Sequence, residues 1–298
     1  MSAVIETTQL TKKFGSAEAV DGLTFQVPEG SIFAYLGPNG AGKTTTIKTF
    51  MNIFEPSSGS ATVLGLDSRQ LSPARLEQIG YVSENQELPL WMTLNYFLGY
   101  CRRFYPSWDP GLCEDLLRRL ELPLGKKLKH LSRGMRMKAA LLASIAYRPK
   151  LLVLDEPFSG LDPLVRDELV EAILGITADH NWTVFVSSHD LAEIENLATH
   201  VAYLDRGRLQ FSEELTSLQA RFRELEITCD QPPPMPSSWP SAWLHPEVSS
   251  TMLRFVASDY SEDETPERVK ALFPTCRDIA TRPLALRSIF TNLARSFR

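Results

Sequence analysis

A glycine-rich segment at residues 37–44, GPNGAGKT, constrains the fold more than any other part of the sequence. It matches the pattern G-x-x-x-x-G-K-[ST], in which a loop curls around phosphate groups and points its backbone N–H groups inward. The pattern requires a strand before the loop and a helix after it. The apolar run at 31–36 predicts that strand, and residues 44–50 predict the helix.

The side chains of this loop suit a phosphate ligand and a divalent cation. Amides near Gly40, Gly42, Lys43 and Thr44 lie at the start of the predicted helix, whose positive dipole end favours an anion. Lys43 offers a point charge to β- and γ-phosphates, and the Thr44 hydroxyl can bind Mg²⁺. We therefore predict a phosphate-binding site at this loop.

A second buried strand ends in two carboxylates, in the segment LLVLDE at 151–156. Open α/β proteins bind their ligands at the carboxyl ends of the strands. Asp155 there would hold Mg²⁺ through water, and Glu156 would polarise the attacking water of a phosphoryl transfer. Apolar runs at 79–83 and 183–187 predict further strands. Their continuous hydrophobicity favours a parallel sheet that is covered on both faces.

Four further motifs stand in one order along the chain. They are the opening segment LTKKFGSAEAVDGLTFQVPEG at 10–30, LSRGM at 131–135, SGLD at 159–162 and SSHD at 187–190. With the two motifs above, they resemble the ATP-binding subunits of ABC transporters over about residues 5–210. The drug- and lipid-export-like ATPases that pair with separate membrane subunits are the most similar branch.

The resemblance implies an α/β fold of the P-loop NTPase class. Its core would be a RecA-like parallel sheet with an N-terminal antiparallel β-region. A helical subdomain would be inserted at about 86–150. We expect the ABC ATPase domain to cover 1–220 and a small α+β accessory domain to cover 221–298, after a proline-rich linker at 232–240. Residues 252–257 predict a strand there. Apolar residues at 286, 289, 290 and 293 predict a terminal helix.

The resemblance also implies an activity and its partners. The chain would hydrolyse ATP with Mg²⁺, in a head-to-tail homodimer or heterodimer, and drive a transmembrane permease. It would lie in the cytoplasm, on the inner face of the membrane. A net charge of −5 lacks the basic footprint of a nucleic-acid binder, so no nucleic-acid partner is expected. The alternatives are a non-transport ABC ATPase associated with ribosomes or DNA, and a regulatory ABC protein.

Each matching position carries an implied role. Lys43, Glu156 and His189 are the predicted catalytic residues, with His189 sensing the γ-phosphate. Phe14 would stack on adenine, while Ser132 and Gly134 would contact the ATP of the opposite subunit. The predicted nucleotide-binding set is Phe14, Asn39, Gly40, Gly42, Lys43, Thr44, Thr45, Ser132, Gly134 and Asp162, and the predicted metal-binding set is Thr44, Asp155 and Glu84.

Three positions depart from the family motifs. Glu84 stands where glutamine is usual, and its carboxylate can contact Mg²⁺ or water but donates no hydrogen bond unless it is protonated. Gln86 is an alternative donor. In LSRGM, Arg133 and Met135 replace glycine and glutamine. Arg133 stands in a basic cluster that could be a solvated face, an ATP or partner contact, or a nucleic-acid contact; its other members are Lys126, Lys127, Lys129, Arg136 and Lys138.

Seven aromatic residues lie between 91 and 108. Thr93 is expected to cap a helix that carries Tyr96, Phe97, Tyr100 and Phe104. The resemblance implies that some of these side chains line a groove for a short helix of the membrane subunit. The alternative is that they form the core of the helical subdomain. No apolar run reaches the ~20 residues of a membrane helix, and the four cysteines lack metal-binding spacing, as expected for reduced thiols.

Overall fold

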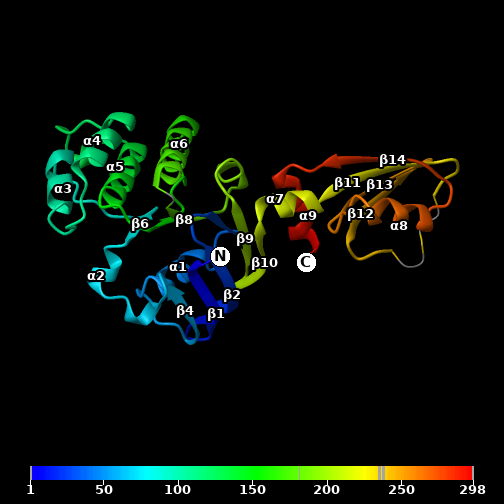
Figure 1. Ribbon diagram of the computed structural model, residues 1–298, viewed down its shortest axis with the longest axis horizontal. Helices are drawn as coiled ribbons and strands as arrows, with labels where there is room; N and C mark the ends of the chain where they lie inside the picture. Colours follow the sequence, from blue (N-terminus) through cyan, green and yellow to red (C-terminus); the bar gives the residue numbers. More distant parts are fainter. Residues whose placement is uncertain (1, 181, 234–235, 237–238, 297–298) are drawn as a thin grey trace. The chain divides into compact units, whose positions relative to one another are not determined.

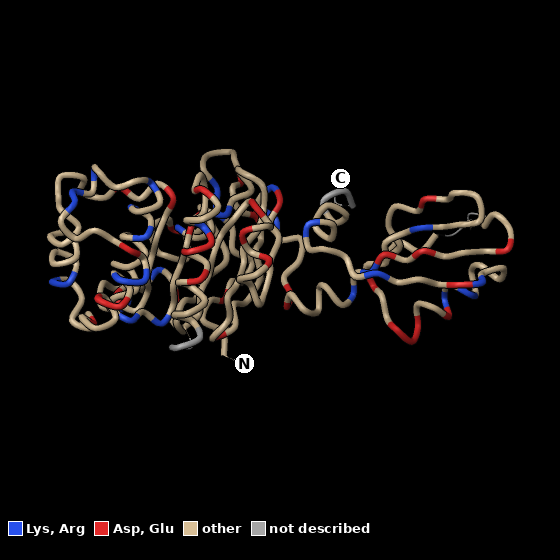
Figure 2. Tube along the Cα trace, turned by 90° about the horizontal axis from the view of Figure 1, so that it is seen from above, with Lys and Arg blue, Asp and Glu red and all other residues tan. Residues whose placement is uncertain are grey.

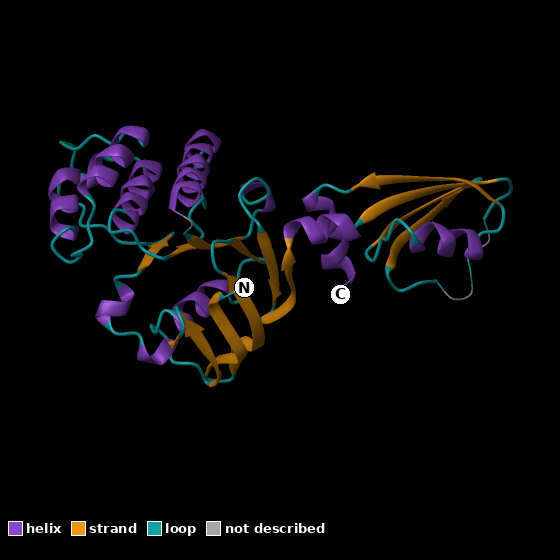
Figure 3. Ribbon diagram, in the orientation of Figure 1, coloured by secondary structure: helices purple, strands orange, loops and turns teal. Residues whose placement is uncertain are grey.

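The computed structural model describes residues 2–180, 182–233, 236 and 239–296. It divides into two compact units, Met1–Ser212 and Glu213–Arg298. Figure 1 follows the chain through both, and Figure 3 shows their helices and strands. That residues 1–220 and 221–298 act as separate domains stays a prediction.

An antiparallel sheet of four strands, in the order β2-β1-β4-β5, opens the first unit. Its strands are β1 (Ala3–Phe14), β2 (Ala17–Pro28), β4 (Ser58–Val63) and β5 (Leu66–Asp67). Gly15 turns the chain between β1 and β2 at a φ of 59°, a left-handed conformation that favours glycine. This sheet is the predicted N-terminal antiparallel β-region.

The second sheet of this unit has six strands in the order β10-β9-β3-β8-β7-β6. They are β3 (Ile32–Leu36), β6 (Ile79–Ser83), β7 (Leu151–Asp155), β8 (Thr183–Ser188), β9 (His200–Asp205) and β10 (Arg208–Glu214). The strands from β9 to β6 run parallel to their neighbours. Every residue of β3, β7 and β8 is buried, because both faces are covered. The predicted parallel sheet is confirmed.

A single hydrophobic cluster takes residues from both sheets and from helix α1 (Lys43–Phe50). Phe33 and Phe185 stack with ring centroids 5.6 Å apart, and Phe50 of α1 meets Phe185 edge-on at 5.2 Å. Such aromatic pairs add to the free energy gained by burying their area. The cluster therefore fixes α1, and with it the phosphate loop, against the ends of the strands.

Helices make up the rest of this unit. They are α2 (Pro73–Leu76), α3 (Leu94–Cys101), α4 (Pro110–Arg119), α5 (Arg133–Ile145) and α6 (Pro163–His180), with short 3₁₀ turns at Ser68–Gln70, Leu128–His130 and Leu191–Glu193. Thr93 caps α3 by accepting from Tyr96 N at 3.2 Å, as predicted. Between residues 86 and 150, all of them described, the chain forms no strand, and α3, α4 and α5 lie together in Figure 1.

None of the described helices combines the length and the apolar character needed to cross a bilayer.

The second unit is built on an antiparallel sheet in the order β12-β13-β11-β14. Its elements are α7 (Leu215–Arg221), β11 (Arg223–Cys229), β12 (Trp243–Ser249), β13 (Met252–Ala257), α8 (Glu264–Leu272), β14 (Cys276–Pro283) and α9 (Leu286–Ser296). Trp243 and Phe255 stack at 4.5 Å in a core that also includes Val269 of α8. β13 and α9 confirm the predicted strand and terminal helix.

The proline-rich stretch at 232–240 connects β11 to β12, inside the second unit. The prediction that it precedes the C-terminal region is wrong, because β11 comes before it and pairs with both β13 and β14. Residues 234, 235, 237 and 238 lie outside the described residues, so the predicted stiff, extended spacer falls partly outside the structure.

Candidate active site

The loop between β3 and α1 has the backbone that the glycine pattern predicts. Gly40 and Gly42 have φ angles of 80° and 106°. A Cβ on Gly42 would lie 2.3 Å from the carbonyl oxygen of Ala19, so any larger residue would displace the loop from β2. Gly42 caps α1 without a side-chain hydrogen bond. The first amides of α1 are therefore available to an anion.

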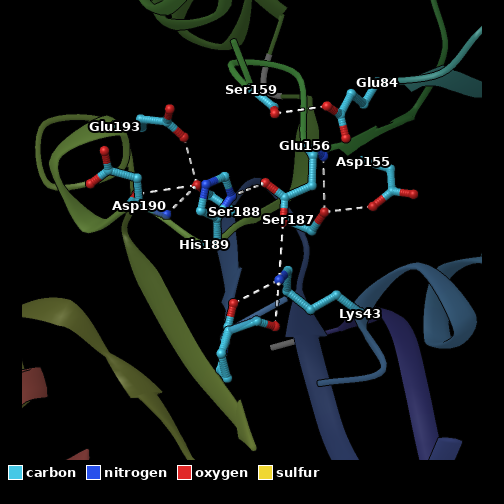
Figure 4. A network of polar contacts seen from close by, with 12 residues as sticks. Lys43, Glu84, Asp155, Glu156, Ser159, Ser187, Ser188, His189, Asp190 and Glu193 are labelled. Atoms are coloured by element: carbon cyan, nitrogen blue, oxygen red, sulfur yellow. Dashed lines mark hydrogen bonds and ion pairs between the residues drawn. The ribbon is translucent and has the colours of Figure 1, made fainter. Parts of the chain in front are cut away.

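Lys43 is 5% exposed and reaches across the mouth of the loop. Its Nζ donates to the carbonyl oxygens of Gly37 at 2.6 Å and Pro38 at 3.2 Å. The same Nζ forms an ion pair with Oε1 of Glu156 at 3.0 Å, as Figure 4 shows. The loop cation is thus held against the carboxylate that follows β7.

Asp155, at the end of β7, is 3% exposed. Its Oδ1 accepts hydrogen bonds from Ser187 Oγ at 2.7 Å and Thr44 Oγ1 at 3.1 Å. Burial raises the pKa of this carboxyl, although both hydroxyl bonds favour the ionised form. The arrangement presents a carboxylate and a hydroxyl, both hard oxygen ligands, at one point beside the loop.

Glu156 links the loop to the segment after β8. Its Oε2 lies 2.7 Å from Nδ1 of His189, and this hydrogen bond raises the pKa of the histidine. Its backbone N–H donates to Ser187 Oγ at 3.0 Å. The φ of Glu156 is 52°, an uncommon conformation for a residue with a side chain and one that clusters at functional sites. Lys43, Glu156 and His189 therefore form one continuous polar chain.

These groups border a cavity of about 240 Å³. It is lined by Ala19, Asn39, Gly40, Gly42, Lys43, Thr44, Thr45, Glu84 and Glu156. Most of the predicted nucleotide-binding residues are therefore brought together. Four others lie outside this lining: Phe14, Ser132, Gly134 and Asp162.

Those four residues lie in two other places, one at the end of β1 and one at the starts of α5 and α6, where Gly134 is buried. Phe14 ends β1, is 47% exposed, and meets Phe54 edge-on at 5.3 Å. Ser132 caps α5 by accepting from Met135 N at 3.1 Å. Asp162 accepts from Val165 N at 3.1 Å at the start of α6.

Gly134 explains why these two helix starts lie together. A Cβ on it would come within 2.5 Å of a methyl of Val165 on α6.

Glu84, predicted as a metal ligand, makes its side-chain contacts elsewhere. Its Oε1 accepts from Ser159 Oγ at 2.8 Å and from Arg133 Nη2 at 3.0 Å. Its backbone N–H donates to the carbonyl oxygen of Asp155 at 2.9 Å. Figure 4 shows Glu84 beside Asp155, turned toward Ser159. That it binds Mg²⁺ stays a prediction.

Sequence reasoning missed several residues that hold the site in shape. Ser187 is the first residue of the SSHD motif, and sequence reasoning gave it no role. Its hydroxyl donates to Asp155 and accepts from the backbone N–H of Glu156. Ser159, the first residue of SGLD, holds Glu84. Ser188 donates to Glu193 at 2.6 Å, and burial raises the pKa of that acid. The motifs contained the serines, but the contacts join segments far apart in sequence.

The predicted basic cluster around Arg133 includes one wrong member. Lys138 is 7% exposed and forms an ion pair with Glu168 of α6, so it does not belong to a basic surface. Arg136 donates to the carbonyl oxygen of Leu131 at 3.0 Å, which engages one of its donors. The cluster therefore offers less free positive charge than the sequence indicates.

The aromatic stretch divides between core and surface. Phe97 is buried against the helical part, which bears out the core alternative for that residue. Trp91, Tyr96, Tyr100 and Phe104 are 47–65% exposed. Trp91 and Tyr96 lie 6.0 Å apart, and Tyr100 and Phe104 lie 5.0 Å apart. We call these four side chains the aromatic surface.

Comparison with known proteins places this geometry in a family. The ABC transporter family profile matches residues 20–159. The bacitracin transport ATP-binding protein BcrA of Bacillus licheniformis is 34% identical over 211 residues, covering 70% of this chain and 69% of its own. The probable multidrug ABC transporter ATP-binding protein YbhF of Escherichia coli is 35% identical over 223 residues, covering 73% of this chain and 38% of its own.

Solved structures agree. The structure of an ATP-binding subunit of an ABC transporter superposes with a TM-score of 0.66 at 28% identity, covering 73% of this chain and 92% of that one. A dimeric ATP-binding cassette bound to ADP and Pi, at 21% identity and a TM-score of 0.63, shares the fold over 71% of this chain and 98% of its own. The chain belongs to the ABC transporter ATP-binding proteins and is an ABC-type ATPase, the ATP-binding subunit that energises a transporter.

Proposed function

We propose that the polar chain Lys43–Glu156–His189 is the hydrolytic centre of this ATPase. Lys43 would leave the carbonyls of its loop to bind the β- and γ-phosphates, and Glu156 would then be free to orient the attacking water. His189 would contact the γ-phosphate. The observation that carries this proposal is the position of Glu156, within 3.0 Å of the loop lysine and 2.7 Å of the histidine. Positioning and charge neutralisation are the main demands of phosphoryl transfer.

Mg²⁺ fits the pair formed by Asp155 and Thr44. Asp155 is a buried carboxylate whose Oδ1 accepts from two neutral hydroxyls, so a cation would relieve the cost of its burial. Among the residues that the structure describes, no group of three or more His, Cys, Asp and Glu side chains could hold a metal. One carboxylate and one hydroxyl suit Mg²⁺, which keeps several waters and takes further oxygens from phosphates.

Mg²⁺ binding should weaken as the pH falls. Burial raises the pKa of Asp155, so the metal-free fold loses stability as the pH rises from the ordinary pKa of the group to that raised value. A bound cation removes this cost. We therefore expect the Mg²⁺-induced rise in unfolding temperature, measured with ADP present, to grow as the pH rises through the same window. Asp155→Asn should make the rise small and independent of pH.

Asp167→Asn, an exposed position on α6, is the matched control and should behave as the unmodified chain. An unchanged Mg²⁺ response in Asp155→Asn would count against a metal at this carboxylate.

We infer a head-to-tail dimer in which ATP contacts Ser132 and Gly134 of the opposite subunit. Ser132 and the first amides of α5 form a second anion-favouring helix start, outside the lining of the loop cavity. A second subunit would bring this helix start to the γ-phosphate. Phe14, exposed at the end of β1, is the proposed adenine contact.

We propose that ATP hydrolysis by this chain drives a separate permease of the drug- or lipid-export type. The relatives named for bacitracin and multidrug transport support this class. The aromatic surface on the helical part is the proposed docking point, which would hold the chain at the cytoplasmic face of the membrane. Basic and acidic residues both occur along the trace of each unit in Figure 2, and the absence of a nucleic-acid partner stays an expectation.

ATPase assays with and without vesicles that contain the permease test this proposal. Alanine at Trp91, Tyr96 and Tyr100 should leave the basal rate of the purified subunit within about twofold, because these side chains lie outside the cavity lining. Stimulation by the permease and transport should be lost. Val248→Ala, an exposed apolar position in the second unit, should change neither. Equal loss of basal and stimulated rates would rule out a docking role.

A further inference from the structure

Arg133 and Glu84 are the two charged departures from the family motifs, and the structure joins them. Nη2 of Arg133 donates to Oε1 of Glu84 at 3.0 Å. One residue belongs to the LSRGM segment and the other follows β6, so 49 positions separate them. Each departure, taken alone, is a substitution within its motif that the sequence does not explain. Their contact indicates that they form one unit.

The contact is built from three segments. Arg133 is the first residue of α5, and its guanidinium lies over Gly160, where an added Cβ would come within 2.6 Å of Nη1. Gly160 has a φ of 65°, a left-handed conformation that favours glycine, and it carries no Cβ that would meet the guanidinium. Ser159, the neighbour of that glycine, donates to the same Oε1 of Glu84 at 2.8 Å. The carboxylate therefore accepts two bonds on one oxygen from two directions.

Glu84 stands at a boundary between two cavities. It lines the phosphate cavity with Lys43, Thr44 and Glu156. It also lines a neighbouring cavity of about 370 Å³, together with Arg133. Its backbone is tied to the end of β7 by the bond to the carbonyl oxygen of Asp155. The main chain is thus fixed beside the phosphate site, and Arg133 and Ser159 decide where the carboxylate points.

Charge explains why the two departures occur together. Glu84 places a carboxylate, where glutamine would be neutral, among the residues that line the phosphate cavity, and Glu156 already lies there. A neutral glycine in the LSRGM segment could not offset this, whereas the rigid fork of an arginine binds a carboxylate with charge and directed donors. Because the side chains are 48% and 31% exposed, water screens the pair, and its effect should be on position more than on stability.

We propose that Arg133 is a positioning residue of the hydrolytic centre, which acts within its own subunit by holding the carboxylate of Glu84 at the edge of the phosphate site. This inference rests on the proposed function, since it assumes that MgATP binds in the loop cavity. It assigns Arg133 to the same subunit's site, in contrast to a contact with the ATP of the opposite subunit.

A kinetic double-mutant cycle on the full chain tests the assignment. In the unmodified background, Arg133→Ala should lower kcat at saturating MgATP about fivefold and leave KM within twofold, the size typical of a coupled pair. In the Glu84→Gln background, the same substitution should change kcat less than twofold, because no carboxylate remains to be held. Arg133→Lys, which keeps the charge, should recover part of the rate.

A second cycle measures the contact without turnover. In the nucleotide-free chain, Arg133→Ala should lower the unfolding temperature by about 1–3 °C in the unmodified background and by less in Glu84→Gln, the range expected for a half-exposed pair.

In the kinetic cycle, equal kcat losses in both backgrounds would show that Arg133 acts on another group, such as the opposite subunit's ATP, and would overturn the proposal. Absence of a kcat loss in the unmodified background would overturn it as well.

The two proposals fail in different ways. If Lys43→Ala retains full ATPase activity, the loop cavity is not the hydrolytic site and the proposed function fails. If Lys43→Ala is inactive but the Arg133 and Glu84 substitutions have independent effects on kcat, only the pairing is wrong.

Discussion

Replacing Lys43 by alanine is expected to abolish ATP hydrolysis. The ammonium is the cation of the loop cavity, 3.0 Å from Glu156 and held by two loop carbonyls. Without it, the charge that builds on the transferred phosphoryl group loses its main protein counter-charge. We expect a fall in kcat/KM of at least about 10³-fold, or roughly 4 kcal/mol of transition-state stabilisation. Phosphate release by the purified chain measures it.

Folding must be separated from chemistry in this variant. Lys43 and Glu156 are a buried pair, with side chains 5% and 11% exposed, and removing the lysine leaves His189 as the remaining charged partner of the carboxylate, which should destabilise the fold. The double variant Lys43→Ala/Glu156→Gln removes both charges and should recover most of the unfolding temperature while remaining inactive. Lys48→Ala, on the same helix but outside the cavity lining, should stay active. Hydrolysis by a stably folded Lys43→Ala chain would disprove the role of the lysine.

The local motifs predicted the cavity lining because each is a strand, a tight loop and a helix start that are close in sequence. Gly42 illustrates this, since its φ of 106° at the start of α1 is a backbone conformation that favours glycine. Buried strands were equally predictable. A strand of a sheet that is covered on both faces needs apolar residues at every position, and such a run is visible in the sequence. Sequence reasoning therefore succeeded where the cause of the structure lies within a few residues.

It failed where the cause lies in contacts between distant segments. Lys138 reads as surface charge from composition alone, because its partner Glu168 is 30 residues away on α6. The proline-rich stretch at 232–240 reads as a linker, because nothing local shows that β11 pairs with strands that follow it. The bond from Arg133 to Glu84 is of the same kind. These two residues depart from separate motifs, and only the folded structure shows that they contact each other.

Glu156→Gln is expected to bind ATP but hydrolyse it at least about 100-fold more slowly than the unmodified chain, a barrier increase of roughly 2.7 kcal/mol. The amide keeps the size of the carboxylate and can still accept from Lys43 and contact His189, whose distances to Glu156 are 3.0 and 2.7 Å. It loses the negative charge that orients and polarises the attacking water. Binding should therefore survive while chemistry stops, and ATP-bound dimers should accumulate.

Light scattering coupled to size-exclusion chromatography measures that accumulation, with ATP and then with ADP. Only ATP should shift Glu156→Gln toward the dimer, because ADP lacks the γ-phosphate that the opposite subunit's Ser132 is proposed to contact. Glu171→Gln removes an acid exposed on α6 and should hydrolyse ATP normally without trapping a dimer. If Glu156→Gln instead turns over ATP at the unmodified rate, another group must activate the water, and the interpretation of the Lys43–Glu156–His189 chain as the hydrolytic centre would have to be abandoned.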